Sequence, residues 1–378
     1  MELTDEQRSL QEAVRDFAKR ECGTREQRDA LTDGGHDHHN QELYDRVAEL
    51  GWIGVAIPEE YGGSGGGATD MCLFLEEATR GRLPIGFYAI SMIVAGAYQR
   101  FGTEEQKQEI LGGIVRGRPE AIAMSEPQAG SDVGALSCRA ERRDGSYVLN
   151  GQKTWISGAH KTEHVLVVVR SDRSGTKHQG LTMISVPKDS DGMEVRGIDT
   201  MGGREVNDIF FTDCEIPADR VLGEEGNGWS QLMSGLNLER LIIAANALGI
   251  AQRAFDDTLA YIKEREQFGR PIGSFQALRH RIADLATEIE STRYLVYGVA
   301  AKVDRNPEQL LPREASMAKL KATEVAKAMA LEGMQMMGGY GYASEYDMEG
   351  DVRTALVMPI YGGTSEIQRE IISKTYGL

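Results

Sequence analysis

Cysteine and long apolar runs are both scarce in this sequence. The four cysteines, Cys22, Cys72, Cys138 and Cys214, are scattered over 378 residues and form no C-x-x-C pair. That spacing argues against a cysteine-based metal site and fits a reducing compartment. No apolar run approaches the roughly 20 residues that a membrane-spanning helix needs. We therefore expect no membrane span.

Positive charge is also in short supply. Lys and Arg number 42 against 58 Asp and Glu, which gives a net charge of −16. No basic patch stands out to neutralise phosphates, so we expect neither nucleic acid nor an anionic membrane surface as a partner. An acidic protein that binds a phosphorylated ligand must rely on local donors such as helix N-termini, Gly-rich turns and a few arginines.

Several familiar site patterns are missing. No G-x-G-x-x-G follows a strand, so a Rossmann dinucleotide site is not indicated, and we find no internal repeat or low-complexity tail. His36, His38 and His39 lie close together in the segment 34–40 and could hold a metal. Because Gly and Asn dominate that segment, a solvated turn is the favoured interpretation, and we expect no metal site.

The periodicity of apolar residues divides the chain into α, β and α regions. Residues 1–120 read as helices, the first opened by a Thr4/Gln7 capping box. Residues 121–225 follow a period of two, with Gly, Pro, Asn and Asp at the turns, which predicts a compact β sandwich or barrel. Residues 226–378 carry long helical patterns typical of an antiparallel bundle. We therefore predict an α+β multidomain protein: an N-terminal α domain (1–120), a middle β domain (121–225) and a C-terminal four-helix bundle (226–378).

One carboxylate interrupts the most apolar of the predicted helices. In the run 234–252, spacing of 3.6 residues places five side chains on one stripe: Leu236, Glu239, Ile243, Ala247 and Ile250. Burying an unpaired carboxylate costs several kcal/mol, so Glu239 must be paired, face a cavity or have a raised pKa. A raised pKa suits a general base. The alternative is an ordinary ion pair with Arg240 or a neighbouring helix.

Other stretches combine turns with side chains suited to a ligand. Residues 123–132 form a loop of small residues, hydroxyls and a proline. In residues 154–158 a Trp beside a Ser could stack on a planar heterocycle, although a core Trp is the usual explanation. Residues 265–271 interrupt the long helix, and the glycines in 335–341 end the next one, normally only as a C-cap. In residues 361–368 a Gly pair leads into a helix whose Ser365-x-x-Gln368 reads as a capping box with free N–H groups.

Taken together, in this order and over essentially the whole chain, these stretches resemble the acyl-CoA dehydrogenase family. The resemblance implies an N-terminal helical domain, a central β domain, a C-terminal four-helix bundle, a homotetramer and an extended FAD cofactor. It assigns cofactor contacts to Ile122, Met124, Ser125, Ser131, Trp155, Ile156, Ser157, Arg265, Phe268, Gln276, Gln335, Gly338, Gly339, Thr364, Ser365 and Glu366. It assigns substrate contacts to Ser131, Asn237, Arg240, Gly362 and Gly363.

One departure from the common family pattern bears on mechanism. Many members place the catalytic glutamate directly after the Tyr of the terminal motif, where this chain has Gly362. A smaller branch, similar to isovaleryl-CoA and long-chain acyl-CoA dehydrogenases, carries it in a motif like Asn237-Leu238-Glu239-Arg240. The resemblance therefore implies that Glu239 is the catalytic base, while Gly362 keeps a backbone N–H for the thioester oxygen.

The implied reaction is the FAD-dependent α,β-dehydrogenation of an acyl-CoA to a trans-2-enoyl-CoA. The α-proton passes to Glu239, the β-hydride to flavin N5, and the electrons to an electron-transfer flavoprotein. Two alternatives stay open: an acyl-CoA oxidase-like flavoenzyme, and a non-catalytic subunit of a heteromeric dehydrogenase. The expected location is the bacterial cytoplasm, in preference to a mature mitochondrial matrix form.

Overall fold

The computed structural model describes residues 3–378, which form two compact units. One unit takes in the chain up to Leu31 together with Gly67–Leu83 and Asn237–Leu378. The other comprises Thr32–Gly66 and Pro84–Leu236. The predicted domain boundaries near residues 120 and 225 follow changes in secondary structure, whereas these units follow packing. The boundaries therefore stay a prediction.

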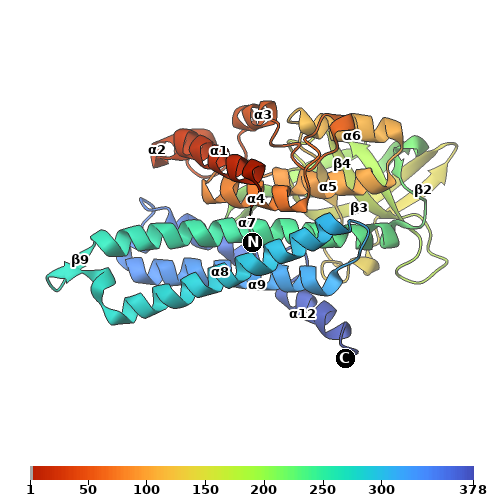
Figure 1. The fold of residues 1–378 in the computed structure, drawn as a ribbon. Helices are drawn as coiled ribbons and strands as arrows, with labels where there is room; N and C mark the ends of the chain where they lie inside the picture. Colours follow the sequence, from red (N-terminus) through yellow and green to blue (C-terminus); the bar gives the residue numbers. More distant parts are fainter. Residues whose placement is uncertain (1–2) are drawn as a thin grey trace. The chain divides into compact units, whose positions relative to one another are not determined.

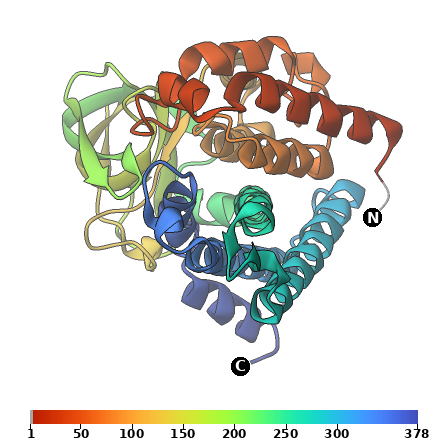
Figure 2. The same ribbon diagram turned by 90° about the vertical axis from the view of Figure 1, so that its left-hand side faces the viewer.

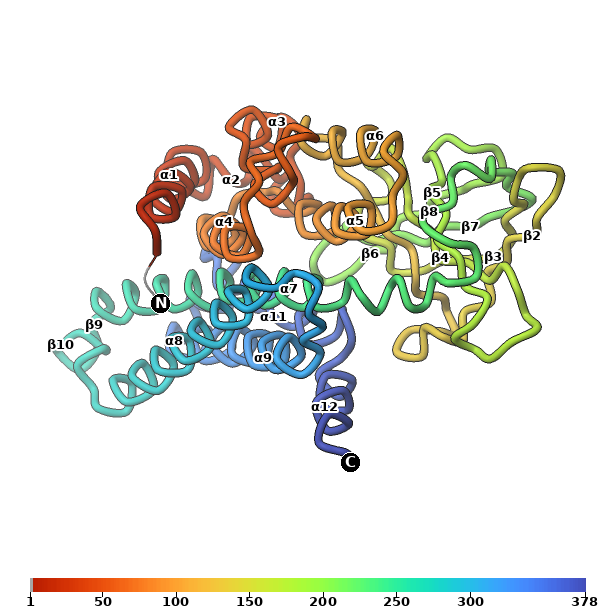
Figure 3. Tube along the Cα trace, turned by 45° about the vertical axis from the view of Figure 1, so that its right-hand side comes forward, coloured from red at the N-terminus to blue at the C-terminus, as the bar shows by residue number. Residues whose placement is uncertain are grey.

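Long helices dominate the first unit. Its helices and hairpin are α1 (Asp5–Cys22), α2 (Arg25–Thr32), α4 (Ala68–Arg80), α7 (Gly228–Glu264), β9 (Glu266–Gln267), β10 (Arg270–Pro271), α8 (Gln276–Arg305), α9 (Pro312–Met337), α10 (Gly339–Tyr342), α11 (Met348–Val357) and α12 (Ser365–Lys374). Helix α7 belongs to this unit from Asn237 onward. Helices α8 and α9 lie side by side (Figure 1). Helix α12 packs against α9 and leads to the C-terminus (Figure 3).

Local sequence explains where these helices begin and end. The predicted capping box of α1 is confirmed, since the backbone N–H of Gln7 donates to Thr4 Oγ1 and that of Thr4 to Gln7 Oε1, both at 3.2 Å. Helix α9 starts with Pro312, whose fixed φ suits a first turn, and ends at Gly338 with φ +63°. Alanine is the commonest residue on its buried face, which allows close packing against neighbouring helices.

The second unit combines three helices with a mixed sheet, whose strands are coloured yellow to green in Figure 2. Its elements are α3 (Gln41–Glu49), α5 (Tyr88–Phe101), α6 (Glu104–Val115), β1 (Ala121–Ala123), β2 (Arg139–Arg143), β3 (Ser146–Ser157), β4 (His164–Arg170), β5 (Leu181–Pro187), β6 (Met193–Thr200), β7 (Gly203–Pro217) and β8 (Val221–Leu222). The strand order is β6-β7-β3-β2-β4-β5-β8, and β1 pairs with β4 in parallel. Strand β4 is buried along nearly its whole length, as its run of valines predicts.

The predicted fold class is confirmed: helices, then a mixed sheet, then helices. Three strands of this sheet were not predicted: β1 and β8 span only three and two residues, and β2 reads RAERR with a single buried side chain. The predicted Ser365/Gln368 capping box is wrong. Thr364 caps α12 by accepting from the N–H of Ile367, and Gln368 turns back to the preceding glycines. None of the helices within residues 3–378 is long and apolar enough to cross a membrane.

The histidine-rich turn is solvated at Gly34, Gly35 and His36, as predicted, but not at His39. His39 is only 2% exposed and stacks on Phe87 with ring centroids 4.4 Å apart. Burial lowers the pKa of His39 to about 4, so its ring is neutral at physiological pH. Within the described chain no group of three or more His, Cys, Asp or Glu side chains is placed to hold a metal ion.

Candidate active site

Glu239 lies on α7 beside the turn that precedes α12. A Cβ atom placed on Gly362 would lie 3.5 Å from Glu239 Oε1, so this carboxylate faces the position where a side chain at 362 would start. The Glu239 side chain is half-buried, and no residue from 3 to 378 forms a hydrogen bond or ion pair with it. Burial raises the pKa of Glu239, while the charges of Arg240 and Lys319 oppose that rise.

Arg240, the next residue, does not neutralise Glu239. The Arg240 side chain is 6% exposed, its Nε has no hydrogen-bond partner in the described chain, and no ion pair joins it to Glu239. Burial lowers the pKa of Arg240, and the charge of Glu239 opposes that fall. Asn237, one turn earlier, is also buried. The simple ion-pair interpretation of Glu239 is therefore wrong.

Gly362 and Gly363 form a turn that only glycine fits well. Their φ angles are +61° and +79°, in the left-handed region that costs other residues about 1–2 kcal/mol. A Cβ on Gly362 would also come within 2.1 Å of Ile243 Cδ1, and one on Gly363 within 2.7 Å of Gln368 Nε2. The carbonyl oxygens of this turn accept from buried side chains: Gln368 Nε2 lies 3.0 Å from both, and Lys319 Nζ lies 2.9 Å from that of Gly363.

In the second unit, the loop after β1 is held by a buried ion pair. Lys153 Nζ lies 2.7 Å from Glu126 Oε1 and 3.0 Å from the carbonyl oxygen of Met124, and both charged side chains are almost fully buried. Burial would raise the pKa of Glu126, but Lys153 and the N–H groups of Ser137 and Cys138 lower it. This pair fixes the backbone that presents the predicted contacts Ile122, Met124 and Ser125. Ser131, farther along the loop, is exposed.

Trp155 is not a core tryptophan. Its side chain is 61% exposed, and its φ of +62° lies where a non-glycine residue costs of order 1–3 kcal/mol. The pairing of β3 with β7 shifts register between Lys153 and Ile156, so a bulge turns Trp155 outward. Ile156 points inward, and its carbonyl accepts from Asn207 Nδ2 at 2.9 Å. An exposed aromatic residue in strained backbone indicates a site rather than a fold requirement.

A third set of predicted cofactor residues gathers at the hairpin and helix ends of the first unit. Phe268 is 92% exposed, with φ +54°, at the tip of the β9–β10 hairpin, where a glycine or asparagine normally stands. The Arg265 guanidinium lies 5.2 Å from the ring centroid of Tyr340. Gln276 begins α8 and is exposed, as are Gln335, Gly338, Gly339 and Glu366.

Thr364 and Ser365 are less free to contact a ligand than predicted. Thr364 Oγ1 already caps α12. The Ser365 side chain is buried, and its hydroxyl donates to Glu324 Oε1 at 2.6 Å.

Two residues beside the glycine turn, Lys319 and Gln368, were not predicted as residues of the site. Both are completely buried. Lys319 interrupts an alanine stripe on α9, with Ala315 four residues before it and Ala322 three after. That is the same kind of signal that identified Glu239, and it could have identified Lys319.

Comparisons with known proteins agree with this architecture. Family models of acyl-CoA dehydrogenase match in order along the chain: the N-terminal domain at residues 4–118, the middle domain at 121–214 and the C-terminal domain at 226–377. A probable acyl-CoA dehydrogenase of Bacillus subtilis is 38% identical over 99% of this chain and 98% of its own length. The mitochondrial 2-methylacyl-CoA dehydrogenase of Solanum tuberosum is 37% identical over 98% and 90%.

Solved structures give the same result. The crystal structure of an acyl-CoA dehydrogenase from Geobacillus kaustophilus superposes with a TM-score of 0.93 at 32% identity, covering 100% of this chain and 99% of that one. Fold and relatives define an oxidoreductase built of helical, sheet and helical parts. The chain belongs to the acyl-CoA dehydrogenase family.

Proposed function

We propose that this chain oxidises the Cα–Cβ bond of an acyl-CoA thioester with Glu239 as the catalytic base. The observation that carries the proposal is a carboxylate without a partner in residues 3–378, with its Oε1 3.5 Å from the Cβ position of Gly362. In family members that place the catalytic glutamate directly after the terminal Tyr, that side chain would start at the position of Gly362. The two alternative sites for the base therefore share one location.

We propose FAD as the cofactor, and the residues present fit a flavin. Trp155 offers an exposed aromatic face held in strained backbone, and Phe268 does the same in the other unit. Ser125 and Ser157 carry hydroxyls beside the fixed loop and the bulged strand, and Arg265 offers a cation at the hairpin. We propose that the Phe268 hairpin serves a neighbouring subunit of a homotetramer, since the Phe268 ring is 92% exposed at the hairpin tip.

When bound, FAD supplies at N5 the acceptor for the β-hydrogen, which leaves with its electron pair. Glu239 receives the α-proton, and its raised pKa suits a base that must take a proton from a very weak carbon acid. The N–H of Gly362 is proposed to donate to the thioester oxygen, which stabilises the developing enolate. The new double bond joins Cα and Cβ, and the product is a trans-2-enoyl-CoA.

The electron acceptor and the acyl group are proposals supported by relatives. The subunit CarC of a caffeyl-CoA reductase–Etf complex from Acetobacterium woodii is 35% identical over 99% of this chain, which supports an electron-transfer flavoprotein as the acceptor. Isovaleryl-CoA and 2-methylacyl-CoA dehydrogenases among the relatives support a branched substrate. The bacterial cytoplasm remains the proposed location, on the strength of the relative from Bacillus subtilis.

An oxidase is the competing function. The prolyl acyl carrier protein oxidase AnaB has a TM-score of 0.90 to this chain at 28% identity, so oxidase activity occurs on this fold. A non-catalytic subunit is the other alternative.

The deciding experiment is anaerobic flavin bleaching by a panel of straight and branched acyl-CoAs. We expect a yellow protein bleached by at least one thioester and reoxidised faster by an electron-transfer flavoprotein than by oxygen. Fast reoxidation by oxygen supports the oxidase. A colourless protein that takes up no added FAD supports the non-catalytic subunit.

A further inference from the structure

Burying the charged side chain of Lys319 costs free energy. Its side chain is completely buried on the alanine face of α9, and among residues 3–378 its ammonium group forms one hydrogen bond, to the carbonyl oxygen of Gly363. An ammonium has three donors, and taking it out of water costs several kcal/mol unless it is well paired. A methionine or leucine would fill the same space at lower cost. A buried charge with so few partners calls for another explanation.

The hydrogen bond of Lys319 falls on the turn that faces Glu239. Lys319 holds the carbonyl of Gly363 from α9, while Gln368 holds the carbonyls of both glycines from α12. Each carbonyl shares a rigid plane with the N–H of the following residue, so fixing two consecutive carbonyls fixes the orientation of the turn. Gly363 completes this arrangement, because a side chain there would displace Gln368.

The charge of Lys319 acts on the same carboxylate. The charged groups around this pair are Arg240 on α7, Glu324 on α9 and Glu366 on α12. Burial lowers the pKa of Lys319 to about 8, against the opposing charge of Glu239, so the amine is mostly protonated at neutral pH. Burial raises the pKa of Glu239, and the positive charges of Arg240 and Lys319 limit that rise. Lys319 therefore favours the ionised form that a base requires.

We propose that Lys319 is a positioning residue for the dehydrogenation: it fixes the Gly362–Gly363 turn and keeps Glu239 ionised. This inference rests on the proposed function, since it assigns Lys319 a part in the reaction of Glu239. The hydrogen bond and the charge of Lys319 are two contributions that can be measured separately. Gln368 supplies only hydrogen bonds, whereas Lys319 supplies a hydrogen bond and a charge.

The expected pH dependence follows from the sign of the charge. Flavin reduction requires ionised Glu239, so its rate rises as pH rises through the pKa of that carboxyl. Removing the positive charge favours the neutral acid and moves this rise to higher pH. Above about pH 8 the wild-type amine itself loses its proton, so the charge difference between wild type and variant disappears there.

The test compares the rate of flavin reduction from pH 6 to pH 9 in the wild-type holoenzyme and in Lys319→Met. We expect the midpoint to rise by about one pH unit, so that the deficit of the variant relative to wild type is larger on the acid side of the midpoint than at pH 9. Gln368→Leu should slow reduction by a similar factor at every pH. Lys321→Met is the matched control, because Lys321 lies on the same helix, is 42% exposed and pairs with Glu288. Its profile should overlay that of wild type.

A Lys319→Met profile parallel to wild type at every pH would overturn the inference and leave only a structural lysine. Should that variant fail to fold, Lys319→Gln, which keeps a donor and loses the charge, gives the same comparison. Flavin content and thermal midpoint, measured on each variant, identify misfolding. If the wild-type flavin is bleached by no acyl-CoA, the proposed function fails instead, which is a distinguishable result.

Discussion

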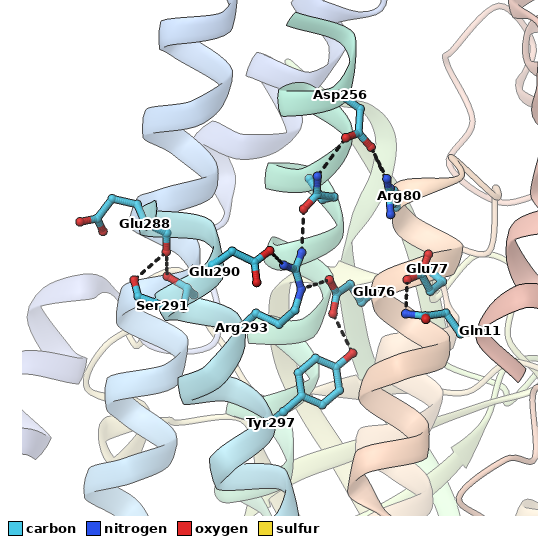
Figure 4. Close-up of polar contacts among 12 residues, drawn as sticks. Gln11, Glu76, Glu77, Arg80, Asp256, Glu288, Glu290, Ser291, Arg293 and Tyr297 are labelled. Atoms are coloured by element: carbon cyan, nitrogen blue, oxygen red, sulfur yellow. Dashed lines mark hydrogen bonds and ion pairs between the residues drawn. The ribbon is translucent and has the colours of Figure 1, made fainter. Parts of the chain in front are cut away.

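Glu76 and Glu239 are two carboxylates in the same compact unit with opposite surroundings. Glu76, on α4, is 4% exposed and fully partnered: Arg293 Nε lies 2.9 Å from Oε1, and the Tyr297 hydroxyl lies 2.7 Å from Oε2 (Figure 4). The network continues from Arg293 to Gln252 at 2.7 Å and on to Asp256 at 2.9 Å. It lines a cavity of about 380 Å³.

Glu239, on α7, is half-buried and has no such network anywhere in residues 3–378. Burial raises the pKa of Glu239. Beside Glu76, burial and then the negative charge of Glu76 raise the pKa of Tyr297. Glu76 is the more deeply buried of the two carboxylates, yet it is the one with partners. We expect a carboxylate with partners to stabilise the fold, and one without partners to be available for a proton from a substrate.

Removing the carboxylate at 239 should give the largest change in activity. Glu239→Gln should bind flavin as wild type does and reduce it about a thousandfold more slowly with the best acyl-CoA of the panel, because a general base contributes about 10²–10⁴-fold. Anaerobic stopped-flow absorbance measures this. The free energy of unfolding should stay within about 0.5 kcal/mol of wild type or exceed it, since no partner is lost. A rate within tenfold of wild type would contradict the assignment.

Removing the carboxylate at 76 should give the reverse pattern. Glu76→Ala leaves Arg293 and Tyr297 without their shared acceptor, which should cost about 3 kcal/mol in the free energy of unfolding, about a hundredfold in the folding equilibrium. Urea unfolding followed by tryptophan fluorescence measures the loss. Glu290→Ala is the matched control: Glu290 pairs with the same arginine but is 59% exposed, so its loss should cost under about 1 kcal/mol.

The rate of flavin reduction per bound flavin should stay near wild type in Glu76→Ala. A loss of activity as large as that of Glu239→Gln, in folded and flavin-loaded protein, would remove the distinction between the two carboxylates.

A smaller effect should come from moving the base across the shared location. Gly362→Glu in a Glu239→Gln background should recover little by itself, because its Cβ would meet Ile243 Cδ1 at 2.1 Å. Adding Ile243→Ala makes room, and the triple variant should reduce flavin about tenfold faster than Glu239→Gln, with the remaining deficit due to strain at φ +61°. The double variant Glu239→Gln/Ile243→Ala controls for the cavity. No recovery over that control with any acyl chain would argue against a shared location.

Sequence periodicity predicted the architecture because most elements carry strong patterns. The interrupted stripe of α7 led to Glu239, and the period of two over residues 121–225 predicted the region that holds strands β1 to β8. The strand β2 was not predicted, because four of its five residues are charged and leave no alternation of apolar and polar side chains. The Ser365/Gln368 cap failed because a capping box is a local pattern, whereas Gln368 is used by tertiary contacts with the glycine turn.

The sequence did not show which charged side chains form ion pairs. Adjacent Glu239 and Arg240 suggested an ion pair, but successive residues on a helix point in different directions, and the two do not pair. The strain at Trp155 and at Phe268 is likewise a property of backbone geometry that residue type conceals. Lys319 was not predicted, because a single charge in an alanine stripe is a less specific pattern than a Gly-rich turn.

The central claim is that the α-proton passes to Glu239, and its exchange with solvent tests this most directly. A thioester such as 3,3-dimethylbutyryl-CoA has α-hydrogens but none on Cβ, so the enzyme can remove a proton without any hydride leaving. In D₂O, mass spectrometry should find α-deuteration by wild type and by Glu76→Ala, and about a thousandfold slower deuteration by flavin-loaded Glu239→Gln. Exchange by Glu239→Gln at the wild-type rate would show that another group takes the proton and would contradict the account.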